Sequence, residues 1–283
     1  MNMTLTKTQI GLVSAVVLIT VLLCFAPRTP DKLNDVKSMM SGHAGNNQSA
    51  DHSSAANYLD SSLLSLNEKE RVRVKNLISV ESKASGQEKY NAIDHLVSVL
   101  DTFQKPAASA YYLQMKAVGT HNKEDWTKAA EHYYVGWKYY PAARVLVDSA
   151  IHAFIHVLQI DPNDLSAKTG LGVCYVESTS DPMKGVGLLK EVLSIDSNYV
   201  DALLNLGNFG MTSGQYDKAI SRFEKVLKLK PDYILLYVKI AEAYEKMGNK
   251  GKTIEYLEKY VGKEDDVMLR TSIQNEINKL KNS

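Results

Sequence analysis

Residues Val200–Tyr233 read VDALLNLGNFGMTSGQYDKAISRFEKVLKLKPDY, and this stretch decides the fold. Apolar and small residues recur in it at spacings of three and four, which places them on one face of a helix. They are Leu203, Leu206 and Gly207 in the first half, and Tyr216, Ala219, Ile220, Phe223 and Val226 in the second. Ser213-Gly214 interrupts the pattern and Pro231 ends it. The stretch therefore predicts two helices joined by a short turn, with the small residues Gly207 and Ala219 where the helices cross.

The same stretch resembles a tetratricopeptide repeat (TPR), a helix–turn–helix unit of about 34 residues. The residues at the family's signature positions are Leu203, Leu206, Gly207, Gly214, Tyr216, Ala219, Phe223, Val226 and Pro231. Gly210 departs from the pattern, because the family usually has a tyrosine there. The resemblance implies an all-α fold, a right-handed superhelix of helix-turn-helix pairs that stack on one another.

Two more units of this type adjoin the first. The preceding unit opens at Leu165, has one extra residue in its turn, and is expected to start its second helix at Pro182. The following unit ends at Gly262, and a last helix is expected from Asp265 to Lys281. The last helix has one apolar and one polar side, which is the pattern needed to cap a stack of repeats.

The helix expected from Trp126 to Lys138 fits both the first and the second helix of a TPR. We interpret it as a first helix, paired with the helix expected from Ala142 to Gln159. Pro141 and Pro162 both mark the end of a repeat, and they lie too close together in the sequence to enclose a full one. The resemblance therefore extends from Trp126 to Tyr260.

Three further helices are expected before this region. Their ranges are Asn67–Ser82, Gln87–Gln104 and Ala107–Gly119. The first has the pattern of an N-terminal cap, because Asn67 is followed by Glu70 three residues later.

Ile10–Ala26 reads IGLVSAVVLITVLLCFA and contains no charged residue. Its length approaches that of a bilayer-spanning helix, near the short end of the usual range. A cleaved signal peptide fits less well, because Cys24-Phe25-Ala26 lacks the small residues of a cleavage site. A lipoprotein signal also fits less well, because Leu23 precedes Cys24. We therefore expect an uncleaved, single-pass transmembrane anchor.

The orientation of this anchor has two readings. Arg28, Lys32 and Lys37 follow the apolar run, and by the positive-inside rule they favour a cytoplasmic C-terminal side. Bacterial single-anchor proteins of this layout usually export the large domain, so we expect the folded part in the periplasm. Pro27–Ser54 is polar and is expected to form a flexible linker.

The expected domain organisation follows from these observations. It consists of a short tail (1–9), a transmembrane anchor (10–26), a flexible linker (27–54), an N-terminal helical region of divergent repeats (55–122), a TPR domain (123–262) and a capping helix (263–283).

The charge balance and the cysteine spacing argue against nucleic acid as a partner and against a disulfide framework or zinc site. The 33 basic and 32 acidic residues leave a net charge of +1, so no overall field attracts nucleic acid, and we expect none as a partner. The two cysteines, Cys24 and Cys174, lie far apart in the sequence, which gives no disulfide framework and no zinc motif.

No catalytic motif is present, so we expect no enzyme and no cofactor. The sequence has no phosphate-binding loop and no nucleophile elbow. His152 and His156 stand four apart, a spacing that suits a metal, but the expected buried face of their helix lies elsewhere and no third ligand is apparent. We expect both histidines to point to solvent, and metal dependence through them stays an alternative.

Six tyrosines come in three adjacent pairs, 111/112, 133/134 and 139/140. In each pair, one tyrosine is expected to pack between helices and the other to lie near the surface.

Binding is the remaining class of function. In TPR proteins the inner groove is lined mainly by first-helix positions, and the resemblance assigns these positions residue by residue. The groove residues so assigned are Thr169, Val173, Val176, Leu204, Asn208, Met211, Leu235, Val238 and Glu242. Asn208 matches the asparagine that many members use to hold the backbone of a bound peptide. Thr169, Leu204 and Val238 replace the lysines and arginines of a carboxylate clamp, and the apolar floor suits a hydrophobic or amphipathic segment instead.

The expected function is thus that of a membrane-tethered adaptor or scaffold that binds a protein or peptide partner, in cell-envelope assembly or secretion. A self-associating structural module, and hence a homo-oligomer, is the alternative, in which the groove or the tyrosine-rich front half packs on a second copy.

Overall fold

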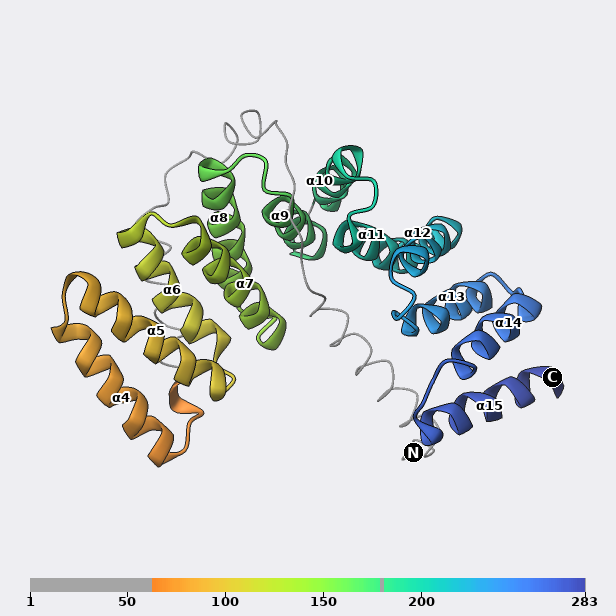
Figure 1. Ribbon diagram of the computed structural model, residues 1–283, viewed down its shortest axis with the longest axis horizontal. Helices are drawn as coiled ribbons and strands as arrows, with labels where there is room; N and C mark the ends of the chain where they lie inside the picture. Colours follow the sequence, from red (N-terminus) through yellow and green to blue (C-terminus); the bar gives the residue numbers. More distant parts are fainter. Residues whose placement is uncertain (1–62, 179–180, 283) are drawn as a thin grey trace. The chain divides into compact units, whose positions relative to one another are not determined.

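The computed structural model describes residues 63–178 and 181–282, and every regular element in these ranges is an α-helix (Figure 1). The chain forms two compact units, one that ends at Ile195 and one that begins at Asp196. The expected anchor at Ile10–Ala26 and linker at Pro27–Ser54 lie outside the described residues. Within the described residues, no helix is both long and apolar enough to cross a bilayer.

Seven helices make up the described part of the first unit. They are α4 (Glu68–Lys83), α5 (Gly86–Thr102), α6 (Pro106–Thr120), α7 (Lys123–Tyr139), α8 (Arg144–Ile160), α9 (Leu165–Ser178) and α10 (Pro182–Ile195). Each helix packs on the next one along the chain. Their bounds agree with the sequence-based expectation to within a few residues.

Local sequence signals explain where these helices begin. The Asn67 side chain accepts a hydrogen bond from the Glu70 backbone, and the Glu70 side chain accepts one from the Asn67 backbone, which forms the predicted cap. Pro106 and Pro182 each occupy the first helical position. Proline is tolerated there because a backbone N–H at this position has no hydrogen-bond acceptor within the helix.

Helix α7 packs closely on both of its neighbours. The predicted contact with α8 is present, and α7 also packs on α6. A Cβ added to Gly136 of α7 would lie 3.1 Å from the backbone of Ala107 in α6. The two readings of this helix as first or second of a pair therefore both correspond to real contacts, and α7 joins the core of α4–α6 to the core of α8–α10.

The second unit contains α11 (Val200–Thr212), α12 (Tyr216–Leu229), α13 (Leu235–Lys246), α14 (Lys250–Val261) and α15 (Val267–Asn282), again in sequential contact (Figure 1). Gly214 and Gly248 both have φ of +73° in the turns between paired helices, which favours glycine there. At the α11–α12 crossing, Gly207 lies against Phe223, and Gly210 lies against Ala219. Both predicted small residues are at the crossing, although they do not face each other.

Helix α15 packs on α14, as expected of a cap, but fewer of its apolar side chains are buried than the sequence pattern predicts. Ile277 is fully buried, whereas Leu269, on the same expected apolar side, is 40% exposed. The helix begins after Asp266, whose carboxylate accepts hydrogen bonds from the backbone of Met268 and Leu269. The N-terminal turn of α15 therefore leaves apolar side chains open to solvent.

The tyrosine pairs follow the prediction in two cases out of three. Tyr112 and Tyr133 are buried, while Tyr111 and Tyr134 are half-buried. Tyr139 and Tyr140 are both exposed, at 59% and 41%, so the prediction is wrong for this pair. The reason is their position, because α7 ends at Tyr139 and the chain then turns away from the core.

Candidate functional site

The groove positions of the first unit lie in packed surroundings. Thr169 and Val173 of α9 are only 5% and 8% exposed, and the Thr169 hydroxyl donates to the Leu165 carbonyl at 2.7 Å. Val176 is half-buried and approaches α10, since a Cβ on Gly185 would lie 2.7 Å from its Cγ2. These three side chains contribute to the helix packing of the first unit.

The groove positions of the second unit are more open, apart from Leu204. Leu204 is 4% exposed. Asn208 and Met211 of α11, and Leu235 and Val238 of α13, are half-buried, while Glu242 is exposed. In the second unit, the predicted groove positions that remain at least partly accessible number five, and we call them the α11–α13 site: Asn208, Met211, Leu235, Val238 and Glu242.

Helix α12 supports both helices of this site. It packs on α11 and on α13, and the Arg222 guanidinium donates to the Leu206 carbonyl of α11 at 3.0 Å. Just before α13, burial and the nearby charge of Asp201 in α11 raise the pKa of Tyr233. Tyr233, at the entry to α13, therefore lies near Asp201 in the first turn of α11, and α12 packs on both helices.

Asn208 is the polar group of the α11–α13 site. Its side-chain oxygen Oδ1 is buried and has no hydrogen-bond partner among the described residues. A buried amide oxygen without a partner costs about 1–3 kcal/mol, so such groups are uncommon in folded proteins. A backbone N–H from a bound chain would satisfy it.

Behind α13, three tyrosine rings and one carboxylate join three helices. Tyr256 of α14 lies 5.5 Å from Tyr244 and 6.3 Å from Tyr237 of α13, measured between ring centroids. Its hydroxyl donates to Glu224 of α12. Burial and this carboxylate raise the pKa of Tyr256, so it stays a neutral donor. The contacts fix α13 against α12 and α14, which gives the α11–α13 site a firm base.

The two histidines of the His152/His156 pair differ in their surroundings. His152 is exposed, but the ring of His156 stacks on Trp126 of α7, with centroids 4.2 Å apart and an interplanar angle of 19°. Burial lowers the pKa of His156. The expectation that both point freely to solvent is thus wrong for His156. Among residues 63–178 and 181–282, no three His, Cys, Asp or Glu side chains are grouped to hold a metal.

Sequence reasoning also missed a polar link between α7 and α9. Tyr134 and Lys138 both donate to the Glu177 carboxylate, at 2.8 and 2.7 Å. The Lys138 ammonium also lies over the Tyr134 and Trp137 rings, 5.6 Å from each centroid. No sequence motif predicts this link, because Lys138 and Tyr134 lie 39 and 43 residues before Glu177 in the chain.

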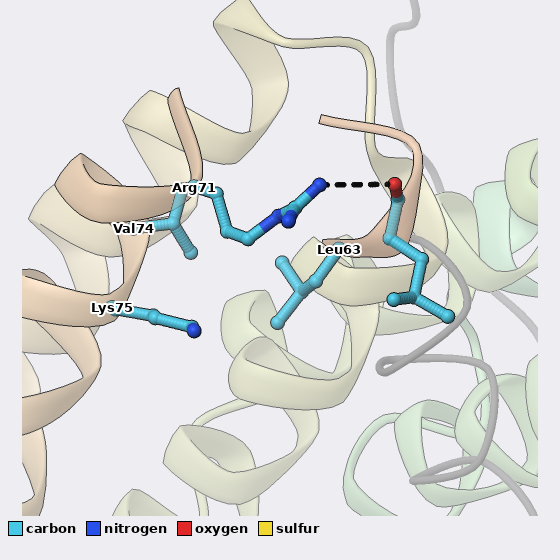
Figure 2. Close-up of a pocket in the computed structure, with 5 residues that line it drawn as sticks. Leu63, Arg71, Val74 and Lys75 are labelled. Atoms are coloured by element: carbon cyan, nitrogen blue, oxygen red, sulfur yellow. Dashed lines mark hydrogen bonds between the residues drawn. The ribbon is translucent and has the colours of Figure 1, made fainter. Parts of the chain in front are cut away.

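A cavity of about 280 Å³ lies beside α4, lined by Leu63, Leu64, Arg71, Val74 and Lys75 (Figure 2). The Arg71 side chain crosses it and donates to the backbone carbonyls of Leu66 and Leu64, at 2.9 and 3.4 Å. The guanidinium therefore ties the chain before α4 to the helix. The cavity lies in the first unit and takes no part in the α11–α13 site.

Comparisons with known proteins bear on the repeats and on the fold. Residues 211–248 match a family model of the TPR repeat, and residues 235–262 match a model of the tetratricopeptide repeat. No curated protein sequence matches the chain.

Three solved structures are similar to this chain, and two of them have a TM-score above 0.5. PilW, a widely conserved type IV pilus biogenesis factor, is 18% identical with a TM-score of 0.53, over 68% of this chain and 86% of PilW. A tetratricopeptide repeat protein from Parabacteroides merdae is 15% identical with a TM-score of 0.53, over 81% of this chain and 87% of the other. MamA protein is 22% identical with a TM-score of 0.49, over 64% of this chain and 94% of MamA.

Proposed function

We propose that this chain, which belongs to the tetratricopeptide repeat family, is a non-catalytic adaptor that binds a hydrophobic or amphipathic peptide segment on its α11–α13 site. The unpartnered, buried Oδ1 of Asn208 is the observation that carries the proposal. It supplies one acceptor for a peptide N–H at a position where other members of the family hold peptide backbone.

The side chains around Asn208 define the kind of segment that fits. Met211, Leu235 and Val238 are half-buried and apolar, so a partner side chain placed on them would remove further apolar surface from water. Methionine adapts its shape to different partners. Glu242 adds one exposed carboxylate at the edge. This combination suits an apolar or amphipathic segment with a free backbone N–H.

Paired substitutions test the proposal. Met211→Glu together with Val238→Glu places two carboxylates on the half-buried apolar surface and is expected to abolish co-purification of the partner. Val267→Glu together with Met268→Glu is the matched control, because it makes the same two changes on α15, at side chains 62% and 82% exposed. Circular dichroism should show unchanged helix content in both. If the first variant captures partner as well as the control, the α11–α13 site is not the binding surface.

Leu204 is unsuited to this experiment. It is 4% exposed, so Leu204→Glu would bury a carboxylate in the second unit and would test folding instead of binding.

A tether at Ile10–Ala26 would give this site a location. The charge-free apolar run supports a single-pass anchor, and Pro27–Ser54 supports a linker that spans about 30 Å as a flexible coil. The tether would raise the local concentration of the site near a bilayer without any new contact.

On this proposal the folded part is exported. An epitope at Ser283 is therefore expected to be digested by protease added to cells with a permeabilised outer membrane. Protection of that epitope until the inner membrane is lysed would contradict export.

A further inference from the structure

The α12 helix and the residue that follows it, Lys230, together carry five cations without a carboxylate partner. They are Lys218, Arg222, Lys225, Lys228 and Lys230, and within the described part of the chain no Asp or Glu oxygen lies within 4.0 Å of any of them. On α14, by contrast, Lys252 and Lys259 both pair with Glu255, at 2.8 and 2.7 Å. The cations of α12 therefore lack the close carboxylate pairing that those of α14 have.

Three of these cations form a row. Lys218, Arg222 and Lys225 are four and three residues apart, so they lie on one face of α12, about one helical turn from each other. We call them the α12 basic row. Each donates only to a neutral acceptor: Lys218 to Gln215 Oε1 at 2.8 Å, Arg222 to the Leu206 carbonyl at 3.0 Å, and Lys225 to the Ser197 carbonyl at 2.6 Å. These bonds hold the side chains in place and leave their charges unpaired.

Arg222 is the centre of the row. It is half-buried, and its burial lowers its pKa, since the surroundings supply no carboxylate to offset the loss of water. One amino group of the guanidinium bonds to Leu206, and none of its nitrogens is buried without a partner, so the others reach solvent. A planar guanidinium with free donors is the group best suited to a two-point hydrogen bond with a carboxylate.

We propose that the α12 basic row is a second docking surface, separate from the α11–α13 site, and that it binds an acidic segment of a partner protein. Carboxylates spaced one per helical turn would match the row. The row has three cations and extends over about two helical turns, which suits a short acidic segment better than the extended phosphate backbone of a nucleic acid or the surface of an anionic bilayer. The net charge of +1 for the whole chain provides no wider basic surface for either.

A synthetic helical peptide with glutamates at positions i, i+4 and i+7 tests this proposal on the full chain, with the glutamine version of the same peptide as the reference. Fluorescence anisotropy at low salt is expected to show that the glutamate peptide binds at least about tenfold more tightly. Lys218→Glu with Arg222→Glu should weaken this binding by about tenfold or more, and Lys218→Gln with Arg222→Gln should weaken it less. Arg222→Lys should weaken the binding by about threefold, because lysine keeps the positive charge but cannot form the two-point hydrogen bond of a guanidinium.

Lys250→Glu with Lys263→Glu is the matched control, since it makes the same change in net charge at two exposed lysines of the same unit. The control and the Met211→Glu, Val238→Glu variant are both expected to bind the peptide as the wild type does, which separates this proposal from the peptide site on α11 and α13. Equal binding of the two peptides, or an equal loss in the Lys250/Lys263 control, would overturn the proposal. Tighter binding of anionic phospholipid vesicles or duplex DNA to the basic row would also overturn it, in favour of those partners.

Discussion

The ring of Phe223 in α12 occupies the space beside Gly207 in α11, so that a Cβ added to Gly207 would lie 2.4 Å from Phe223 Cε1. Such a distance is too short for two carbon atoms, and Phe223 is fully buried, so its ring has little room to move. The α11–α12 pair therefore depends on a glycine at this position, and the α11–α13 site depends on that pair.

Gly207→Ala should lower the stability of the second unit. Overpacking of a filled core costs about 1–3 kcal/mol, which exceeds the gain of up to about 1 kcal/mol from the helix propensity of alanine. Gly187→Ala in α10 is the control, because nothing lies within 4 Å of the added Cβ and only the propensity gain remains. Urea unfolding followed by circular dichroism compares the midpoints. A Gly207→Ala midpoint at or above that of the wild type would contradict this account of the crossing.

The contact between His132 of α7 and Asp101 of α5 predicts a pH dependence. His132 Nε2 lies 3.2 Å from Asp101 Oδ1, and Ser109 of α6 donates to the same oxygen at 2.6 Å. Burial lowers the pKa of His132, but the hydrogen bond and charge of Asp101 outweigh it and raise the pKa above 6.5. Burial raises the pKa of Asp101, whereas its bonds to His132 and Ser109 outweigh burial and lower it below 3.8.

The sign of the effect follows from these two shifts. The contribution of His132 is fully present below pH 6.5 and is lost as the pH rises through its raised pKa. The contribution of Asp101 is present above pH 3.8 and is lost as the pH falls through its lowered pKa. The His132–Asp101 pair should thus stabilise the first unit more near pH 5.5 than near pH 8, by about 0.5–1 kcal/mol for a partly exposed pair, while the lowered pKa of His156 in the same unit acts in the opposite direction. In thermal unfolding scans His132→Gln should therefore destabilise the protein more at pH 5.5 than at pH 8, and an equal effect of this substitution at the two pH values would contradict the assignment.

The ion pair between Lys168 of α9 and Glu191 of α10 is asymmetric in its burial. The Lys168 side chain is 1% exposed, whereas that of Glu191 is 27% exposed. Glu191→Gln removes the carboxylate beside a buried ammonium and should cost about 3 kcal/mol or more. Lys168→Met leaves a carboxylate that water can reach, and it should cost less, about 1–2 kcal/mol. Unfolding midpoints that rank the two variants in the opposite order would contradict this reading.

Cys174 should be unreactive in the folded protein. Its side chain is fully buried in α9, and burial, with the nearby charge of Glu177, raises the pKa of the thiol. Because the thiolate is the reactive form, iodoacetamide should label this cysteine only after unfolding. A Cys24→Ser background isolates the signal, and mass spectrometry measures the labelled fraction with and without denaturant. Rapid labelling under native conditions would show that the first unit opens easily.

The sequence was informative wherever a short-range rule sets the structure. The Asn67 and Glu70 cap, the turn at Gly214 and the start of α10 at Pro182 each depend on residues within one helical turn, so that spacing alone identifies them. The helical period also gave the buried faces of α11 and α12. These features predict the fold before any long-range contact is known.

The remaining features depend on contacts between residues far apart in the chain. Lys168 lies among apolar residues of α9, and its pairing with Glu191, 23 residues later, helps to explain why a lysine is tolerated there. His156 looked solvent-facing from its helical phase, because that phase does not show that Trp126 covers it. Likewise the family pattern assigned Thr169 and Leu204 to a groove, and the packing of neighbouring helices determines how much of each is accessible.

Site-specific crosslinking tests the central claim most directly. A photoreactive residue at Met211, and separately at Val238, should crosslink in cells to one and the same segment of a partner protein, identified by mass spectrometry. A photoreactive residue at Thr271, on the exposed side of α15, should not crosslink to that segment. The adduct from Met211 should also fall when Asn208 is changed to Ala. Equal adducts from Thr271, or an adduct from Met211 that the Asn208→Ala change leaves undiminished, would contradict a peptide held between α11 and α13.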